Sequence, residues 1–193
     1  QKFLNLYLRF SYLADALEMS DKILKKYPHD IPALRGRAIS LFRLNKFADA
    51  QKAAEILSQV DPLGLESQSL TLQIMQSNKQ SLTDMIQHIQ QVMDKNPENP
   101  SLELLMCQVY RNNNKMEEAL KWARQAASRK ITDPLVLRST AFVLDQMQEY
   151  TDATGVLEKN AAHTTDPELF RFWILRQWLL GRYSQVAQQL QTL

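Results

Sequence analysis

Apolar residues recur at helical spacing along the chain, and short polar breaks divide them into pairs of segments. Leu34, Ala38 and Leu41 share one helical face, because they lie three or four residues apart. After a polar break at 44–46, a second apolar pattern begins at Phe47. Each such pair predicts an antiparallel helical hairpin. Neither helix can bury its apolar face alone, so neighbouring hairpins must stack. The same pattern predicts further hairpins from these segments: 102–112 with 116–129, and 135–146 with 150–162.

A four-residue motif marks the start of each second helix, and it ends in a small residue in most copies. The last residues of the six copies are Ala16, Ala50, Met85, Ala119, Ala153 and Val186. Successive copies lie 34, 35, 34, 34 and 33 residues apart. Prolines that stop an apolar helical pattern follow nearly the same period: Pro28, Pro62, Pro97, Pro134 and Pro167. A period of this length indicates a helical-repeat array.

On these residues the chain resembles the tetratricopeptide repeat (TPR) family over essentially its whole length. The second repeat shows the residue pattern of this family most fully, with Ala38 in the first helix, Phe47 and Ala50 in the second helix, and Pro62 after it. The resemblance implies an all-α, right-handed superhelical α-solenoid of about five to six antiparallel helix-turn-helix repeats. We expect a single array over 1–193, excised from a longer protein. Its approximate repeats are 1–30, 31–64, 65–99, 100–133, 134–166 and 167–193.

Two repeats depart from the motif at the small residue that opens the second helix. Met85 and Val186 occupy that position. A small residue there allows two helices to approach closely, so a larger side chain should widen the local helix spacing.

Net charge and apolar runs argue against two classes of partner. The chain has 23 basic and 21 acidic residues, a formal charge of +2. This lacks the broad positive field of nucleic-acid binding, so we expect no nucleic-acid partner. The most apolar run, Leu169–Leu180, contains Arg171 and Arg176. It is therefore too polar for direct membrane insertion. The compartment, cytoplasmic or periplasmic, stays open.

Residues able to carry catalysis are few and scattered. His29, His88 and His163 have no ligand partner at metal-binding spacing. Cys107 lies within a predicted helix, at a position where this repeat has a small buried residue. No nucleophile elbow, phosphate-binding glycine loop or paired-carboxylate motif occurs in the sequence. We therefore predict a protein that is not an enzyme, with no catalytic residues, no metal site and no cofactor.

The family resemblance implies that the first helix of each hairpin lines a concave groove. The predicted groove residues are Arg35, Phe42, Arg43, Arg111, Arg138, Phe142, Arg171, Phe172 and Trp178. Periodicity places Leu104 among these outward-facing positions as well. Arginine pairs with carboxylates and stacks on rings, so we expect a protein or peptide partner with acidic and apolar residues. The alternative is that these arginines only cover solvated helix faces.

The segment Leu169–Leu180 is apolar on more than one face. Its residues Phe170, Trp173 and Ile174 suit the core, whereas the following point elsewhere: Phe172, Leu175, Trp178 and Leu179. Either a partner protein or a further repeat of a longer chain would cover them. Exposed apolar ends also predict end-to-end self-association.

Taken together, these features predict a non-catalytic scaffold for protein–protein interaction that binds a peptide or protein segment in its concave groove. Residues 33–38, Ala-Leu-Arg-Gly-Arg-Ala, and a Gln-rich surface loosely resemble repeat arrays of bacterial envelope and polysaccharide-export proteins. The alternative is a regulatory or substrate-docking TPR segment of a larger enzyme, such as a glycosyltransferase. The sequence does not decide between these two settings.

Overall fold

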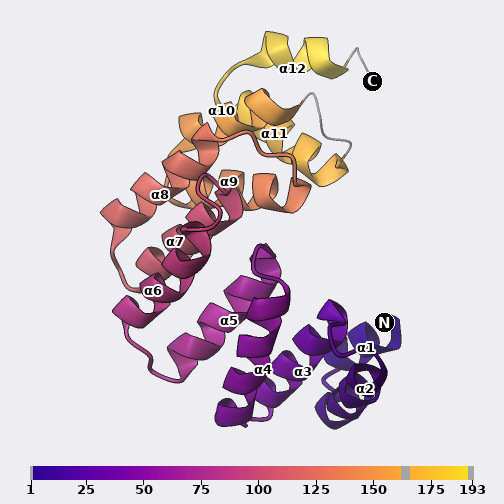
Figure 1. The fold of residues 1–193 in the computed structure, drawn as a ribbon. Helices are drawn as coiled ribbons and strands as arrows, with labels where there is room; N and C mark the ends of the chain where they lie inside the picture. The colour runs from indigo at the N-terminus through magenta and orange to yellow at the C-terminus, as the bar shows by residue number, and fades with distance from the viewer. Residues whose placement is uncertain (1, 162–165, 191–193) are drawn as a thin grey trace. The chain divides into compact units, whose positions relative to one another are not determined.

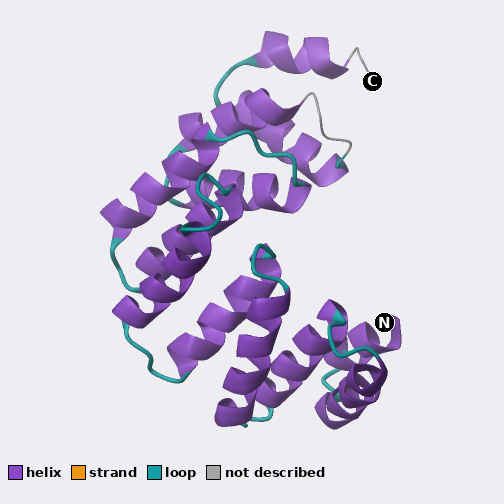
Figure 2. Cartoon of the chain, viewed as in Figure 1, coloured by secondary structure: helices purple, strands orange, loops and turns teal. Residues whose placement is uncertain are grey.

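A computed structural model describes residues 2–161 and 166–190 of the chain (Figure 1). Within these ranges the secondary structure consists of helices joined by loops, with no strand (Figure 2). The predicted all-α class is therefore confirmed. The chain forms two compact units, one reaching to Lys95 and the other starting at Asn96. A single continuous array across the two units stays a prediction.

Each unit consists of helical hairpins in which an odd-numbered helix packs against the even-numbered helix that follows. The first unit contains α1 (Lys2–Arg9), α2 (Leu13–Lys26), α3 (Ile31–Arg43), α4 (Phe47–Val60), α5 (Leu65–Ser77) and α6 (Leu82–Met93). The second unit contains α7 (Pro100–Asn112), α8 (Met116–Ser128), α9 (Pro134–Gln146), α10 (Tyr150–Ala161), α11 (Pro167–Leu179) and α12 (Tyr183–Leu190). We call the odd-numbered helices first helices and the others second helices. These bounds agree with the predicted hairpins to within two residues.

The turn between the two helices of each hairpin passes through one residue with positive φ. These residues are Ser11 (60°), Asn45 (59°), Lys79 (58°), Asn114 (59°), Gln148 (64°) and Gly181 (73°). They lie 34, 34, 35, 34 and 33 residues apart along the chain. The left-handed region favours glycine and, to a lesser degree, asparagine. Gly181, Asn45 and Asn114 are of these two types. The backbone therefore repeats with the same period as the sequence motif.

Small residues at the start of the second helices are fully buried. Ala50, Ala119 and Ala153 are 0% exposed, and the larger Met85 is 3% exposed at the same position. Helices α5 and α6 approach each other less closely than α3 and α4 do. This looser approach agrees with the wider spacing predicted at Met85, since its side chain stands where the other pairs have alanine.

Gly36 on α3 allows a close approach of helices in the first unit. A Cβ atom at this position would lie 2.8 Å from Leu4 Cδ2 and 2.9 Å from Ser20 Oγ. Both distances are shorter than side-chain carbons tolerate. The absence of a side chain at Gly36 thus lets α3 pack against α1 and α2.

A buried polar network joins α4, α5 and α6 in the first unit. The Gln68 side chain is 2% exposed and donates to Ser58 Oγ (3.0 Å) and to the Asp61 carbonyl (3.1 Å). His88 Nε2 lies 3.0 Å from Gln68 Oε1, to which it donates as the N–H tautomer. Burial lowers the pKa of His88 below its ordinary value of 6.5, and the negative charge of Glu55 partly offsets this. His88 is therefore a neutral imidazole at neutral pH and contributes to the packing of this unit.

Candidate functional site

The candidate site lies on two first helices of the second unit, α9 and α11. Both begin with an aspartate cap followed by a proline. The Asp133 carboxylate accepts a hydrogen bond from the Leu135 backbone N–H (2.8 Å), and Asp166 accepts one from the Glu168 N–H (2.9 Å). These caps satisfy helix N–H groups and fix where each helix starts. The start in turn fixes which residues face outward.

A cleft of about 290 Å³ lies between the outward faces of these two helices. Its lining residues are Arg138, Phe142, Glu168, Arg171, Phe172 and Leu175. Phe142 is 51% exposed and Leu175 is 50% exposed, so apolar surface faces solvent beside two arginines. This arrangement suits a segment that presents an apolar side chain next to a carboxylate.

Arg176 ties α11 to α9 and contacts Phe172, one of the residues that line the cleft. Its guanidinium donates to Asp145 Oδ2 on α9 (2.6 Å), and the two side chains are only 19% and 12% exposed. The same guanidinium lies over the Phe172 ring at 5.1 Å and the Tyr150 ring at 5.7 Å. These contacts hold the Phe172 ring in position as part of the cleft wall.

The charged groups at the mouth of the cleft are open to solvent. Arg171 lies 3.2 Å from Glu168, one turn earlier on α11, with side chains 78% and 65% exposed. Such a pair contributes about 1 kcal/mol at most, so a ligand carboxylate can compete for Arg171. Arg138 is likewise exposed. The cleft is therefore bordered by two guanidinium groups and one carboxylate.

A second hollow, of about 320 Å³, lies on the other side of α11. It is lined by Phe170, Arg171, Ile174, Leu175 and Trp178. Arg171 and Leu175 border both hollows, and so form a ridge between them. Trp178 is 55% exposed, and its ring meets the ring of Tyr183 on α12 edge-on at 6.3 Å.

The prediction that α11 is apolar on more than one face is confirmed. Trp173 is 6% exposed, whereas Leu179 is 56% exposed. Phe170 and Ile174, expected in the core, are only partly buried, and Phe172, expected outside it, is partly buried too. Fewer of these α11 side chains are fully buried than helix periodicity predicts.

The predicted groove residues of the first unit are engaged within the protein. Arg35 on α3 pairs with Glu66, the second residue of α5. Arg43 donates to the Leu8 carbonyl at 3.1 Å. Phe42 is partly buried and packs against the core of its unit. Arg35 and Arg43 therefore join neighbouring repeats, and Phe42 belongs to the core.

The predicted groove residues of the second unit lie in different surroundings. The structure brings four of them together in the cleft: Arg138, Phe142, Arg171 and Phe172. Trp178 lies in the adjoining hollow, and Arg111 donates to Gln146 Oε1 at 2.9 Å. The outward placement of Leu104 is wrong. Its side chain is 5% exposed, because α7 packs against both α8 and α9.

Groups able to carry chemistry are sparse in the described ranges. No cluster of three or more His, Cys, Asp and Glu residues there could hold a metal ion. Burial raises the pKa of the Cys107 thiol to about 11, which disfavours the reactive thiolate at neutral pH. His163 lies outside the described residues. The absence of catalysis, metal and cofactor stays a prediction.

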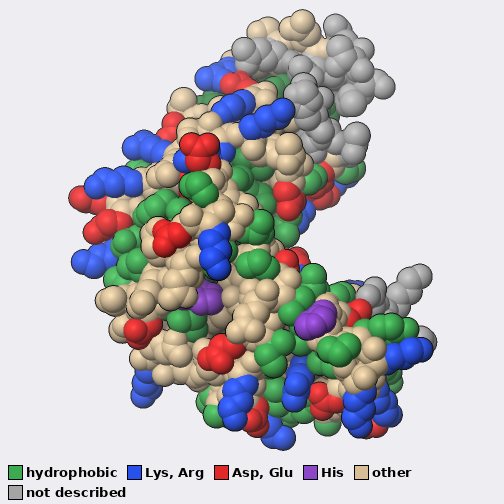
Figure 3. Space-filling model, viewed as in Figure 1, with side chains coloured by type: hydrophobic (Ala, Val, Ile, Leu, Met, Phe, Trp, Pro, Cys, Tyr) green, Lys and Arg blue, Asp and Glu red, His purple; other side chains and the backbone are tan. Residues whose placement is uncertain are grey.

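Two surface properties bear on the expected partners. Among the helices of 2–161 and 166–190, none has the length and apolar character needed to traverse a bilayer. Basic and acidic side chains are interspersed over the face drawn in Figure 3. This mixture matches the small net charge; the absence of a nucleic-acid partner stays a prediction.

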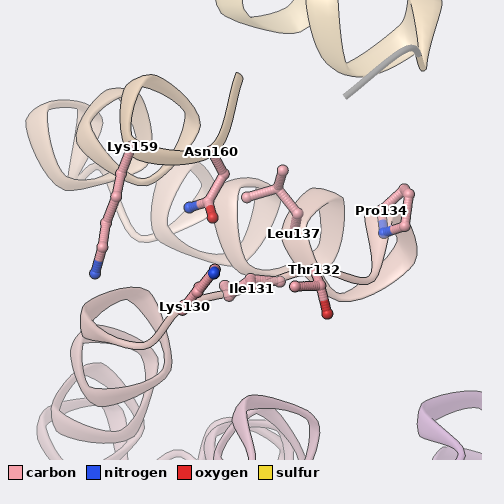
Figure 4. Close-up of a pocket in the computed structure, with 7 residues that line it drawn as sticks. All are labelled: Lys130, Ile131, Thr132, Pro134, Leu137, Lys159 and Asn160. Carbon is pink, nitrogen blue, oxygen red and sulfur yellow. The ribbon is translucent and has the colours of Figure 1, made fainter. Parts of the chain in front are cut away.

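Sequence reasoning missed a cavity of about 560 Å³ beside the turn between α8 and α9 (Figure 4). Its lining residues are Lys130, Ile131, Thr132, Pro134, Leu137, Lys159 and Asn160. Lys159 Nζ donates to the carbonyls of Ser128 (2.6 Å) and Arg129 (3.3 Å), and Asn160 Nδ2 donates to the Val156 carbonyl (2.8 Å). These polar groups are thus bonded to backbone carbonyls at the ends of α8 and α10. The predicted groove residues gather instead in the α9–α11 cleft, so we place the candidate site there.

Comparison with known proteins identifies the fold. No protein-family model matches the sequence, and a search of curated proteins gave no significant match. TTC0263, a thermophilic TPR protein of Thermus thermophilus, is 17% identical over 92% of this chain and 96% of its own, with a TM-score of 0.56. MamA is 14% identical over 84% and 92%, with a TM-score of 0.47. YrrB, described as a TPR protein with an unusual peptide-binding site, is 15% identical over 87% and 86%, with a TM-score of 0.47. The similarity to TTC0263 shows a shared fold.

Proposed function

Because the chain has the tetratricopeptide-repeat fold, we propose that it is a non-catalytic protein-interaction module. Its binding site is the α9–α11 cleft, and its ligand is a segment of another protein with acidic and apolar side chains. Two exposed guanidinium groups beside an open apolar hollow are the observation that carries this proposal. The engaged arginines of the first unit are not part of the site.

The ligand's acidic side chain would bond to Arg138 and Arg171, and its apolar side chain would lie against Phe142 and Phe172. A hydrogen bond to a charged group contributes about 1.5 to 3 kcal/mol, and a buried aromatic contact a comparable amount. After the cost of ordering the segment, a few such contacts give affinity on the order of micromolar. A bacterial envelope or polysaccharide-export assembly is one setting for this binding, suggested by the loose resemblance of residues 33–38. Docking to a larger enzyme is the alternative.

The test uses a peptide library in which one Asp or Glu stands beside one large apolar residue, at varied spacing. Binding is measured by anisotropy on labelled peptides. The double variant Arg138→Glu with Arg171→Glu should abolish binding, with helicity and melting temperature nearly unchanged, because both side chains are exposed. The matched control is Lys115→Glu with Lys121→Glu, an equal charge reversal at two exposed positions, one just before α8 and one within it. If both double variants bind like the unmodified protein, the cleft is not the site.

A further inference from the structure

The cavity beside the turn between α8 and α9 combines a buried apolar floor with exposed basic groups (Figure 4). Ile131 and Leu137 are 5% and 3% exposed, whereas Lys130 and Lys159 are open to solvent. The volume of about 560 Å³ lies within the range of small-molecule sites, about 300 to 1,000 Å³. The described residues that line this cavity are different from those that line the α9–α11 cleft. The two are therefore separate surfaces.

Asn160 is the residue of this cavity that departs from the repeat pattern. It is the seventh residue after Ala153, the last residue of the motif that marks the second helix. The equivalent position is apolar in the five other repeats: Ile23, Leu57, Val92, Ala126 and Leu193. Asn160 is nevertheless only 4% exposed. Burying an amide costs free energy unless its polar atoms are bonded, so the unusual residue calls for a reason.

The first unit shows how the same positions are used when both residues are apolar. Leu57 and Leu34 belong to one hydrophobic core cluster, and they are 0% and 2% exposed. By the repeat alignment these two residues correspond to Asn160 and Leu137. In the second unit Asn160 and Leu137 instead line an open cavity. A polar side chain therefore borders a cavity at a position where the first unit has apolar core.

The Asn160 amide has one atom available to a ligand. Its Nδ2 donates to the Val156 carbonyl (2.8 Å), one turn earlier on α10, so the nitrogen faces that carbonyl and Oδ1 lies on the other side. Within residues 2–161 and 166–190, Oδ1 accepts no hydrogen bond. Figure 4 shows this oxygen pointing from α10 into the cavity. A nearly buried acceptor in this position needs a donor, which a ligand can supply.

The two lysines determine which charge the cavity favours. Lys159 Nζ donates to two carbonyls at the end of α8, at 2.6 and 3.3 Å, which leaves one N–H of the ammonium group. Lys130 has no hydrogen-bond or ion-pair partner in the described part of the chain. The carboxylate of the same turn, Asp133, caps α9. Two positive groups beside one engaged carboxylate favour an anionic ligand.

We propose that this cavity binds a small organic acid that has an apolar body and a hydroxyl group beside its carboxylate, as in an aromatic 2-hydroxy acid. The carboxylate lies against the ammonium groups of Lys130 and Lys159. The hydroxyl donates to Asn160 Oδ1, and the apolar body covers Ile131 and Leu137. This small-molecule site is additional to the protein-binding cleft and does not depend on it.

The test compares three ligands on the full chain: 3-phenyllactate, 3-phenylpropionate, which lacks the hydroxyl, and 3-phenyllactamide, which lacks the charge. Binding is measured from the NMR signals of the Ile131 and Leu137 methyl groups. 3-Phenyllactate should shift these signals saturably and bind several-fold more tightly than the other two. Lys130→Glu should weaken its binding at least tenfold. The matched control, Lys121→Glu at an exposed position of α8, should leave binding unchanged.

Asn160→Leu is a second, independent variant, because it introduces the residue that the equivalent position 57 carries. It should weaken 3-phenyllactate to the level of 3-phenylpropionate, while the melting temperature stays the same or rises. A lower melting temperature with unchanged affinity would make Asn160 a packing residue and overturn the inference. Equal binding of the two acids, unchanged binding by Lys130→Glu, or no saturable shift at millimolar ligand would also overturn it. Arg138→Glu with Arg171→Glu should bind 3-phenyllactate normally, so this result is separate from the test of the cleft.

Discussion

The two units use the arginines of their first helices in different ways. In the first unit Arg35 pairs with Glu66 across a repeat boundary, and the pair joins α3 to α5. In the second unit Glu168, which like Glu66 is the second residue of its helix, bonds to Arg171 of its own helix. Arg138 is left facing an open cleft. An arginine on a first helix is therefore a candidate for ligand binding only where the next repeat does not engage it.

The largest expected effects test whether the two units respond separately. Ala50→Leu in the first unit and Ala153→Leu in the second should each lower the free energy of unfolding by about 1 to 3 kcal/mol, since both overfill a fully buried position. Hydrogen exchange should show lost protection mainly in the unit that carries the substitution. Ala48→Leu, at an exposed position of α4, is the control and should change little. Equal loss of protection in both units would mean that they unfold together.

The tie between α9 and α11 comes next in size. Arg176→Ala should lower the free energy of unfolding by about 2 kcal/mol, because Asp145 loses a partly buried, charge-assisted hydrogen bond. Arg171→Ala, which removes a highly exposed pair, should cost about 0.5 kcal/mol or less. Urea titrations measure both values. Equal effects would show that the Arg176 contacts do not hold the cleft wall.

Charge reversal at equivalent arginines gives a smaller difference between the units. Arg35→Glu should destabilise the protein by about 1 kcal/mol, because it replaces an ion pair with repulsion from Glu66. Arg138→Glu should stay within about 0.5 kcal/mol of the unmodified protein. Thermal melts at low and moderate salt would compare them, and salt should shrink the Arg35 effect. A larger loss at Arg138 would contradict its placement at an open cleft.

The smallest expected effect is a pH dependence carried by the first unit. Burial lowers the folded-state pKa of His88, so the unfolded chain binds a proton more readily near pH 6.5. The stabilisation is complete above the unfolded pKa and falls as pH drops from there toward the folded pKa. Hydrogen exchange at about pH 7.5 and about pH 5.5 should show α4 to α6 losing stability. A His88→Gln variant should lose less over the same interval; an identical loss would assign the effect to carboxylates.

The fold was predictable because its signals are local. Helical spacing, the alanines at 50, 119 and 153, and the recurring prolines each depend on residues within one repeat. The hairpin bounds follow from them directly. The outward direction of Arg138 and Arg171 is local in the same way, since it depends only on helix periodicity.

The sequence could not predict whether each arginine is already bonded within the protein, because its partner lies in the next repeat. Arg35 and Glu66 are 31 residues apart, and Arg111 and Gln146 are 35 apart. Periodicity states which way a side chain points but not what it meets there. Leu104 shows the same limit, because a position that faces outward on one helix is buried when α7 packs against two neighbours.

The positive-φ residue in each hairpin turn has a consequence for how such a chain diverges. Six positions have φ between 58° and 73° while carrying Ser, Asn, Lys, Asn, Gln and Gly. The positive φ at the turn thus does not require one particular residue type, because the helices on both sides impose it. Whole hairpins can duplicate and then drift in sequence while keeping their geometry. Related repeats should therefore remain similar in backbone structure after their sequences have diverged.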